Sequence, residues 1–212
     1  MNISIKCHDN LYKFGLIALL CEVFSSEMEQ RKLSFLDYNS QNILVADIVI
    51  LTLGPGECYI CHPEFYTRSP GLIVGLVDRG HMPARGELPS CINHIIFIPH
   101  DAGVNQMGEM IKHNWLLRKN EKIINAERSC LRCPRKTFTE KQSQIICLSL
   151  LGFTSKQIGV QLDIGQKTVL AHRKGLMDKY RLKSDCQLLQ LLAAVQEKWL
   201  DKSGVKNNFL GR

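Results

Sequence analysis

Basic side chains are concentrated in the last third of the chain, where they could neutralise a polyanion. Residues 134–212 carry 14 lysines and arginines against 6 acidic residues, whereas residues 1–133 carry 13 against 14. A small region with such an excess of positive charge is typical of phosphate-rich partners. Charge alone leaves DNA, RNA and an anionic membrane open as that partner.

Two helices joined by a short turn are predicted to position these basic groups. The first helix is predicted at residues 157–162, the turn at 163–165 and the second helix at 166–179. Their apolar spacing predicts a small buried core, made of Ile146, Leu150, Ile158, Leu162, Ile164, Val169 and Leu176. The residues then left exposed on the second helix are Leu170, Ala171, Arg173, Lys174 and Met177. Two basic residues with small or apolar neighbours on one face suit contact with phosphates and with base edges or thymine methyl groups in the major groove.

Three helix starts in this region follow the capping-box pattern, in which a hydroxyl and a Gln three residues later satisfy each other's backbone amides. They are Thr139 with Gln142, Thr154 with Gln157, and Ser184 with Gln187. Gly152 stands where the first of these helices is expected to end. Together these signals predict a small four-helix domain over residues 137–200, followed by a tail at 201–212.

The same residues resemble the helix-turn-helix of the LuxR/NarL/FixJ family. Residues 139–142 stand at the family's T-x-R-E opening, and residues 150–152 and 154–158 match its L-x-x-G-x-S-x-K-E-I. Its K-T-V-x-x-H is matched by Lys167, Thr168, Val169 and His172. Two positions depart from the family: Leu170 replaces a common Lys, and Gly165 replaces the usual Ser cap. These departures affect the expected target sequence rather than the expected binding.

This resemblance implies a sequence-specific DNA-binding transcription regulator, expected to be an activator. It implies that Leu170, Ala171 and Lys174 face bases. It places near the phosphate backbone Lys156, Lys167, Thr168, His172, Arg173 and Lys179. The helix at residues 184–199 matches the one that pairs two protomers, through Leu188, Leu191, Leu192 and Val195.

The N-terminal half is predicted to be an α/β domain with a flavodoxin-like, mostly parallel sheet over residues 1–117. Apolar runs predict strands at 3–5, 32–38, 47–53, 71–77 and 94–98, and helical spacing predicts helices at 11–24 and 102–117. Gly and Pro in 54–70 and 78–89 predict short or irregular helices there. The charged segment 118–136 is predicted to be a linker.

Residues 8–16 and 46–56 resemble a response-regulator receiver domain. Phosphoryl transfer to a receiver needs a carboxylate nucleophile and further acidic groups that hold Mg²⁺. Thr52 stands at the acceptor position, Cys7 and His8 replace the acidic pair, and Ile98 replaces the lysine before Pro99. The resemblance therefore implies a pseudo-receiver that acts without phosphorylation; the alternative is an unrelated α/β domain.

Regulators with such domains are similar to the Rcs auxiliary regulators, which pair with a second regulator. The expected partners are double-stranded DNA, a second copy or a LuxR-type response regulator in a heterodimer, and RNA polymerase. The similarity points to capsule, fimbrial or virulence genes as targets. With no signal peptide and no apolar run long enough to span a bilayer, the chain is expected to be cytoplasmic.

The cysteines allow functions other than DNA binding. Cys58 and Cys61 fit a haem-attachment pattern, and with Cys130 and Cys133 they would form a Cys₄ zinc site if the fold joined them. No cofactor or metal is predicted, and a cysteine-based redox or metal sensor stays an alternative. The remaining cysteines are expected mostly in the core: Cys7, Cys21, Cys91, Cys147 and Cys186. A ligand-sensing LuxR regulator is a further alternative. An enzyme is not expected, because phosphate loops, nucleophile elbows and carboxylate pairs are missing.

Overall fold

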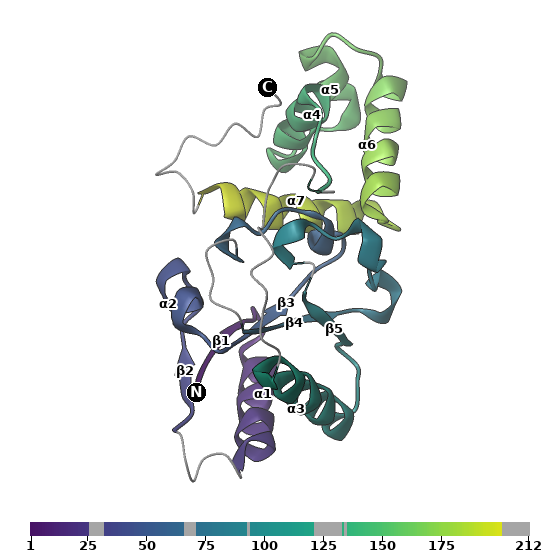
Figure 1. Cartoon of the computed structure of the whole chain (residues 1–212). Coiled ribbons are helices and arrows are strands. Elements are labelled where there is room, and N and C mark those ends of the chain that lie inside the picture. Colours follow the sequence, from purple (N-terminus) through teal and green to yellow (C-terminus); the bar gives the residue numbers. More distant parts are fainter. Residues whose placement is uncertain (26–31, 66–70, 93, 121–132, 134, 201–212) are drawn as a thin grey trace. The chain divides into compact units, whose positions relative to one another are not determined.

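Five parallel strands form one sheet in the N-terminal part of the chain, in the order β2-β1-β3-β4-β5 (Figure 1). The computed structural model describes residues 1–25, 32–65, 71–92, 94–120, 133 and 135–200. The strands are β1 (Asn2–Lys6), β2 (Ser34–Leu36), β3 (Ile48–Thr52), β4 (Leu72–Val77) and β5 (Ile96–Pro99). This strand order is the flavodoxin-like arrangement, so the predicted α/β fold is confirmed.

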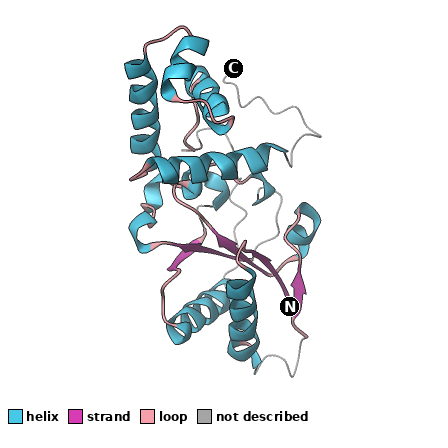
Figure 2. Ribbon diagram, turned by 180° about the vertical axis from the view of Figure 1, so that it is seen from behind, coloured by secondary structure: helices cyan, strands magenta, loops and turns pink. Residues whose placement is uncertain are grey.

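Helices α1 (Asn10–Val23) and α3 (Val104–Asn120) lie on the same side of the sheet in both views (Figure 1 and Figure 2). β4 is buried along its whole length and β3 along all but its last residue, as parallel strands covered on both faces should be. The two helices approach closely at Gly108, where an added Cβ would lie 2.7 Å from a methyl group of Val23. Buried side chains of both helices pack together with those of the strands in the N-terminal core.

The other connections are short. Helix α2 (Ser40–Val45), capped by Asn39, was not predicted from the sequence. The described parts of the segments rich in Gly and Pro, 54–65 and 78–89, form single 3₁₀ turns, as predicted. These are η2 (Glu57–Tyr59), η3 (Pro63–Phe65), η4 (Arg79–His81) and η5 (Arg85–Glu87), and a further turn, η6 (Ser90–Ile92), follows them.

Four helices form the C-terminal part: α4 (Glu140–Leu150), α5 (Ser155–Gln161), α6 (Gln166–Tyr180) and α7 (Asp185–Leu200). The capping boxes predicted at Thr139 and Thr154 are complete. The third is only half formed. The Gln187 amide donates to the Ser184 hydroxyl over 3.2 Å, but the Gln187 side chain accepts from the amide of Lys183 instead. α4 stops as predicted before Gly152, whose φ of +85° favours glycine.

The described chain divides into two compact units. The first comprises Met1–Leu53 and Cys61–Pro134, and the second comprises Gly54–Ile60 and Arg135–Arg212. The domain limits drawn from the sequence stay a prediction, and most of the predicted linker and the whole tail lie outside the described residues. Within the residues that the structure describes, no helix has the length and apolar character needed to cross a membrane.

Candidate nucleic-acid interface

The turn between α5 and α6 requires a glycine inside α5. A Cβ added at Gly159 would lie 2.7 Å from the carbonyl oxygen of Ile164, which is closer than real Cβ atoms approach a backbone atom. The Ile164 amide also donates to the Gly159 carbonyl over 2.9 Å, and Asp163 takes a φ of +51°. Gly159 therefore sets the angle between the two helices. Sequence reasoning missed it, although a glycine inside a predicted helix signals a close approach.

Helix α6 has one face in the core and one in solvent. Val169, Leu176 and Tyr180 recur at helical spacing and are buried against the unit. Ile145 and Ile158 complete the centre of the core beside Val169; Ile145 was not predicted. The opposite face carries the predicted contact residues that are exposed: Lys167, Thr168, Leu170, Ala171 and Lys174. These five residues give the exposed side of α6 two lysines with polar and apolar side chains between them.

Arg173 is not on this exposed surface, contrary to the prediction. It lies four residues after Val169 and three before Leu176, so it falls on the inward stripe of α6. Its side chain is only 16% exposed and forms an ion pair with Asp185 at 2.8 Å. It also donates to the hydroxyl of Ser149 over 3.4 Å. In this arrangement Arg173 ties α6 to α4 and to the start of α7. Met177, also expected to be exposed, is half-buried.

The other predicted contact residues lie at the edges of the surface. Lys156 is exposed on α5, whereas His172 and Lys179 are half-buried on α6. The Lys179 ammonium donates to the carbonyl oxygen of Thr137, so part of its role is to hold the entry to α4. Lys174 pairs with Asp178 one turn away at 2.6 Å, and both side chains are largely exposed. An exposed pair of this kind is weak and leaves the lysine available to a stronger anion.

Comparison with known families identifies this unit. Residues 136–192, which span α4 to α6 and the first half of α7, match the family model described as bacterial regulatory proteins, luxR family. These residues form a LuxR-family helix-turn-helix domain. The resemblance inferred from the capping boxes and the K-T-V-x-x-H spacing is therefore confirmed for the LuxR-family domain.

Solved structures with the same two-part architecture support this assignment at the level of the fold. RcsB from Salmonella enterica serovar Typhimurium bound to promoter P1flhDC in the presence of phosphomimetic BeF3⁻ has a TM-score of 0.54 at 20% identity. A complex of the two-component response regulator RcsB with DNA has a TM-score of 0.51 at 19% identity. Each comparison covers 92% of this chain and 98% of the other. Curated protein sequences provide no match.

The predicted pairing residues on α7 are all buried in this single chain: Leu188, Leu191, Leu192 and Val195. Helix α7 packs against α4 and α6 of the LuxR-family domain. The segment Gly54–Ile60 belongs to the same unit, and a Cβ at Gly56 would lie 3.2 Å from a methyl group of Leu191. Among the described apolar side chains of α7, Leu189 is the large one that remains exposed. The pairing role of the four buried residues stays a prediction.

The predicted degenerate phosphorylation site lies at the carboxyl edge of the sheet. Lys6 of β1 stands opposite Leu51 of β3, so the next residues, Cys7 and Thr52, are neighbours. The Thr52 hydroxyl donates to the carbonyl of Lys6 over 2.9 Å, and Ile98 of β5 is completely buried. Among the described residues, no cluster of acidic, His or Cys side chains could hold a metal ion. The assignment of these residues to a degenerate phosphorylation site, and the lack of phosphorylation, stay predictions.

Two cysteines differ from the expected burial. Cys147 and Cys186 are exposed rather than part of the core, because they lie on the outward faces of α4 and α7. The two C-x-x-C pairs are also divided. Cys58 is buried in the second unit and Cys61 belongs to the first, while Cys130 lies outside the described residues. Burial raises the pKa of the Cys58 thiol to about 12, so Cys58 is an unreactive packing group.

Gly165 stands where the family usually has a Ser, and it leaves the start of α6 without a side-chain cap. Restoring the Ser therefore tests what this difference does to stability. Its φ of −65° and ψ of 146° suit a serine, and an added Cβ would lie no closer than 3.7 Å to Thr168. We expect Gly165→Ser to stabilise the LuxR-family domain by a few tenths of a kcal/mol, because the hydroxyl can accept from an orphan amide. Thermal unfolding of Gly165→Ser, wild type and Gly165→Ala should show decreasing midpoints in that order. An alanine variant as stable as the serine variant would contradict capping as the cause.

Proposed function

We propose that this chain is a sequence-specific DNA-binding transcription regulator that inserts α6 into the major groove. The observation that carries the proposal is the α5–turn–α6 unit with its exposed surface of Lys167, Thr168, Leu170, Ala171 and Lys174. The lysines supply phosphate contacts, and the apolar side chains of Leu170 and Ala171 between them can approach base edges and thymine methyl groups. The RcsB structures that share this fold contain DNA, which is consistent with the proposal.

The family resemblance adds His172, Arg173, Lys156 and Lys179 to the proposed phosphate contacts. Lys156 is exposed and can bind phosphate directly. Arg173 would act on DNA through the placement of α6, since its guanidinium is bound to Asp185 and Ser149. The four lysines Lys156, Lys167, Lys174 and Lys179 therefore supply most of the expected electrostatic contribution.

Binding to duplex DNA should show the salt dependence of these four lysines. Each phosphate contact releases counterions and contributes about −0.9 to the slope of log K against log salt concentration, so we expect about −4 per protomer. This slope can be measured by fluorescence anisotropy with labelled genomic duplexes, at salt concentrations from about 50 to about 300 mM. The complex should also be tested for a sequence preference by competition with unrelated duplex. If the full chain binds no duplex in a salt-dependent manner, the proposal is wrong.

We further propose that the protein acts as a dimer, either with itself or with a LuxR-type response regulator as the Rcs auxiliary regulators do. One of the RcsB structures with this fold holds two RcsB dimers on two parallel DNAs, at a TM-score of 0.50 and 19% identity. The mass of the DNA complex in light scattering distinguishes one protomer from two. Activation, RNA polymerase contact and targets among capsule, fimbrial or virulence genes remain part of this proposal, and chromatin immunoprecipitation with and without partner regulators tests them.

We propose that the N-terminal domain acts without phosphorylation. A hydroxyl is a poor acceptor when no base lies beside it, and the Thr52 hydroxyl is already bound to a backbone carbonyl. We expect acetyl phosphate with Mg²⁺ to leave the mass of the intact chain unchanged, and DNA affinity to be unaffected. A phosphorylatable receiver treated in the same reaction is the positive control. Stable phosphate on any residue of the chain, with a change in DNA affinity, would refute this part of the proposal.

A further inference from the structure

Three cysteines that are distant in the sequence meet at η6 in the first unit. The Cys91 sulfur accepts from the amide of His62, the residue after Cys61, over 3.2 Å, and the Cys61 thiol is close enough to Cys91 to affect its pKa. The Ser90 amide donates to the sulfur of Cys133 over 3.3 Å, which brings a third thiol beside Cys91. Cys61 belongs to the first C-x-x-C pair and Cys133 to the second. The fold therefore brings one cysteine of each pair close to Cys91, which is part of neither pair.

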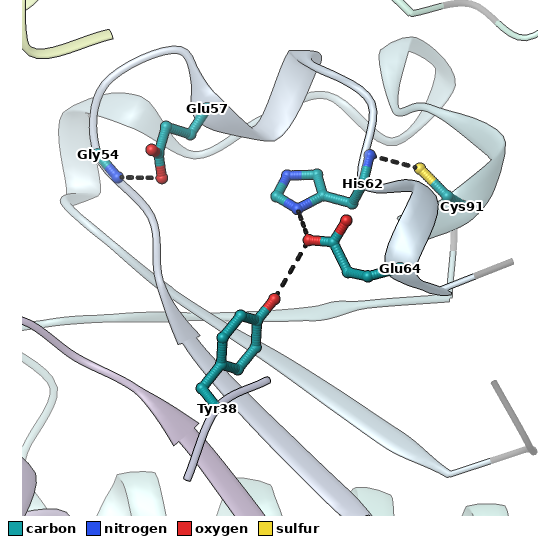
Figure 3. Close-up of polar contacts among 6 residues, drawn as sticks. All are labelled: Tyr38, Gly54, Glu57, His62, Glu64 and Cys91. Atoms are coloured by element: carbon teal, nitrogen blue, oxygen red, sulfur yellow. Dashed lines mark hydrogen bonds and ion pairs between the residues drawn. The ribbon is translucent and has the colours of Figure 1, made fainter. Parts of the chain in front are cut away.

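Hydrogen bonds to the loop around Cys61 hold this arrangement in place (Figure 3). The His62 amide donates to the sulfur of Cys91 over 3.2 Å. The buried His62 ring lies 3.4 Å from a Glu64 carboxylate oxygen, and the Tyr38 hydroxyl donates to the same oxygen over 3.2 Å. These contacts anchor His62, which follows Cys61, and Glu64 of η3, and they therefore hold the chain at Cys61 beside Cys91.

The two thiols differ in access, and Cys91 is held in its protonated form. Cys91 is buried, whereas Cys61 is half-buried and therefore open to a small solute. The interaction of the Cys91 S–H with the Cys61 sulfur, and secondly burial, raise the pKa of Cys91. A thiol that stays protonated is a poor first nucleophile. An oxidant would therefore react first at Cys61, and Cys91 would act second, as the adjacent resolving thiol.

We propose that Cys61 and Cys91 form an oxidisable thiol pair, which a hydroperoxide converts into an intramolecular disulfide. First, the Cys61 sulfur attacks a peroxide oxygen; the O–O bond breaks, an S–O bond forms and one water leaves with the thiol proton. Second, the Cys91 sulfur attacks the sulfenic sulfur of Cys61; the S–O bond breaks, the S–S bond forms and a second water leaves. Two thiols lose two electrons, and one hydrogen peroxide is reduced to two waters.

This modification would act on a particular place in the chain. The chain leaves the first unit at Gly54 and re-enters it at Cys61. The last residue of the first unit is Pro134, which directly follows Cys133. A bond from Cys61 to Cys91 would fasten this return point to η6. The inference concerns the first unit alone and does not depend on the proposed DNA binding.

Peptide mapping after peroxide treatment tests the pair. The reduced full chain is treated with hydrogen peroxide, alkylated with N-ethylmaleimide and digested with trypsin without reduction. Cleavage after Lys and Arg separates Cys91 from Cys133 and leaves Cys58 with Cys61 on one peptide. We expect one major cross-linked product that joins this peptide to the Cys91 peptide, with fragment ions placing the bond at Cys61. Dithiothreitol should remove it, and Cys61 and Cys91 should lose alkylation at the same rate.

Single variants separate this pair from its neighbours. Cys61→Ser and Cys91→Ala should lose the product, whereas Cys58→Ser and Cys133→Ser should keep it. Cys147 and Cys186 are exposed and serve as internal controls for oxidation that forms no intramolecular bridge. A bridge between any other two cysteines would overturn the proposal. The proposal would also be overturned if Cys61 were oxidised to sulfinic or sulfonic acid, and so lost its alkylation, while Cys91 remained fully alkylated. Because alkylation is read on the wild-type chain, poor folding of one variant leaves the test intact.

Discussion

Replacing Gly159 by alanine should disrupt the helix-turn-helix while leaving the N-terminal sheet folded. The added methyl group would meet the Ile164 carbonyl at 2.7 Å, and a backbone oxygen cannot move away as a flexible side chain can. Overpacking in well-packed sites commonly costs about 1–3 kcal/mol, and the rigid neighbour here favours the upper end, about 3 kcal/mol. That is a large share of the stability of a small domain. Hydrogen exchange should become faster across α4 to α6 and stay unchanged in β3 and β4, and duplex binding should be lost.

Gly175→Ala is the matched control for this substitution. Gly175 also lies within a helix, α6, but an added Cβ there meets nothing within 4 Å. Alanine is favoured over glycine inside helices by about 1 kcal/mol, so this variant should be more stable than wild type. The same chemical change should therefore have opposite effects at the two sites. Equal stability of both variants would show that the close approach at Gly159 does not constrain the turn.

Removing Lys167 and Lys174 together should weaken duplex binding by about 10- to 100-fold at moderate salt, because two phosphate contacts and their counterion release are lost. The slope of log K against log salt concentration should become shallower by about 2. Both lysines are exposed on the same face of α6, so truncation should leave the fold intact. Loss of Lys174 also leaves the Asp178 carboxylate unpaired beside DNA, which adds repulsion. Anisotropy with the double variant Lys167→Ala/Lys174→Ala measures affinity and slope together.

The control removes the same charge from the other unit. Lys13 and Lys32 lie in the first unit, and Lys13→Ala/Lys32→Ala lowers the net charge by the same amount. If binding depends on the face of α6, this control should retain almost all of its affinity and its slope. If both double variants lose affinity equally, general charge rather than a recognition helix is responsible, and the assignment of α6 is wrong.

The local features of this fold were predictable because each depends on residues a few positions apart. The capping boxes at Thr139 and Thr154 are complete in the structure, since a hydroxyl and an amide three residues on are adjacent in any helix start. The apolar runs of β3 and β4 predicted a parallel sheet for the same reason. The capping box at Ser184 shows where such prediction from local spacing fails. The amide of Lys183 donates to the Gln187 side chain, which therefore does not accept from the amide of Ser184.

The amino-acid sequence by itself determined the parallel sheet, the helix-turn-helix and the excess of basic residues in the C-terminal part. The spacing of apolar residues, the helix caps and the charges all depend on residues that are close together in the sequence. Only the tertiary structure decided that Arg173 turns inward to Asp185, that Gly159 must lack a side chain, and that Cys61, Cys91 and Cys133 lie together. Each of these depends on the distance between groups on separate elements. Local spacing leaves that distance undefined until the helices and turns have packed.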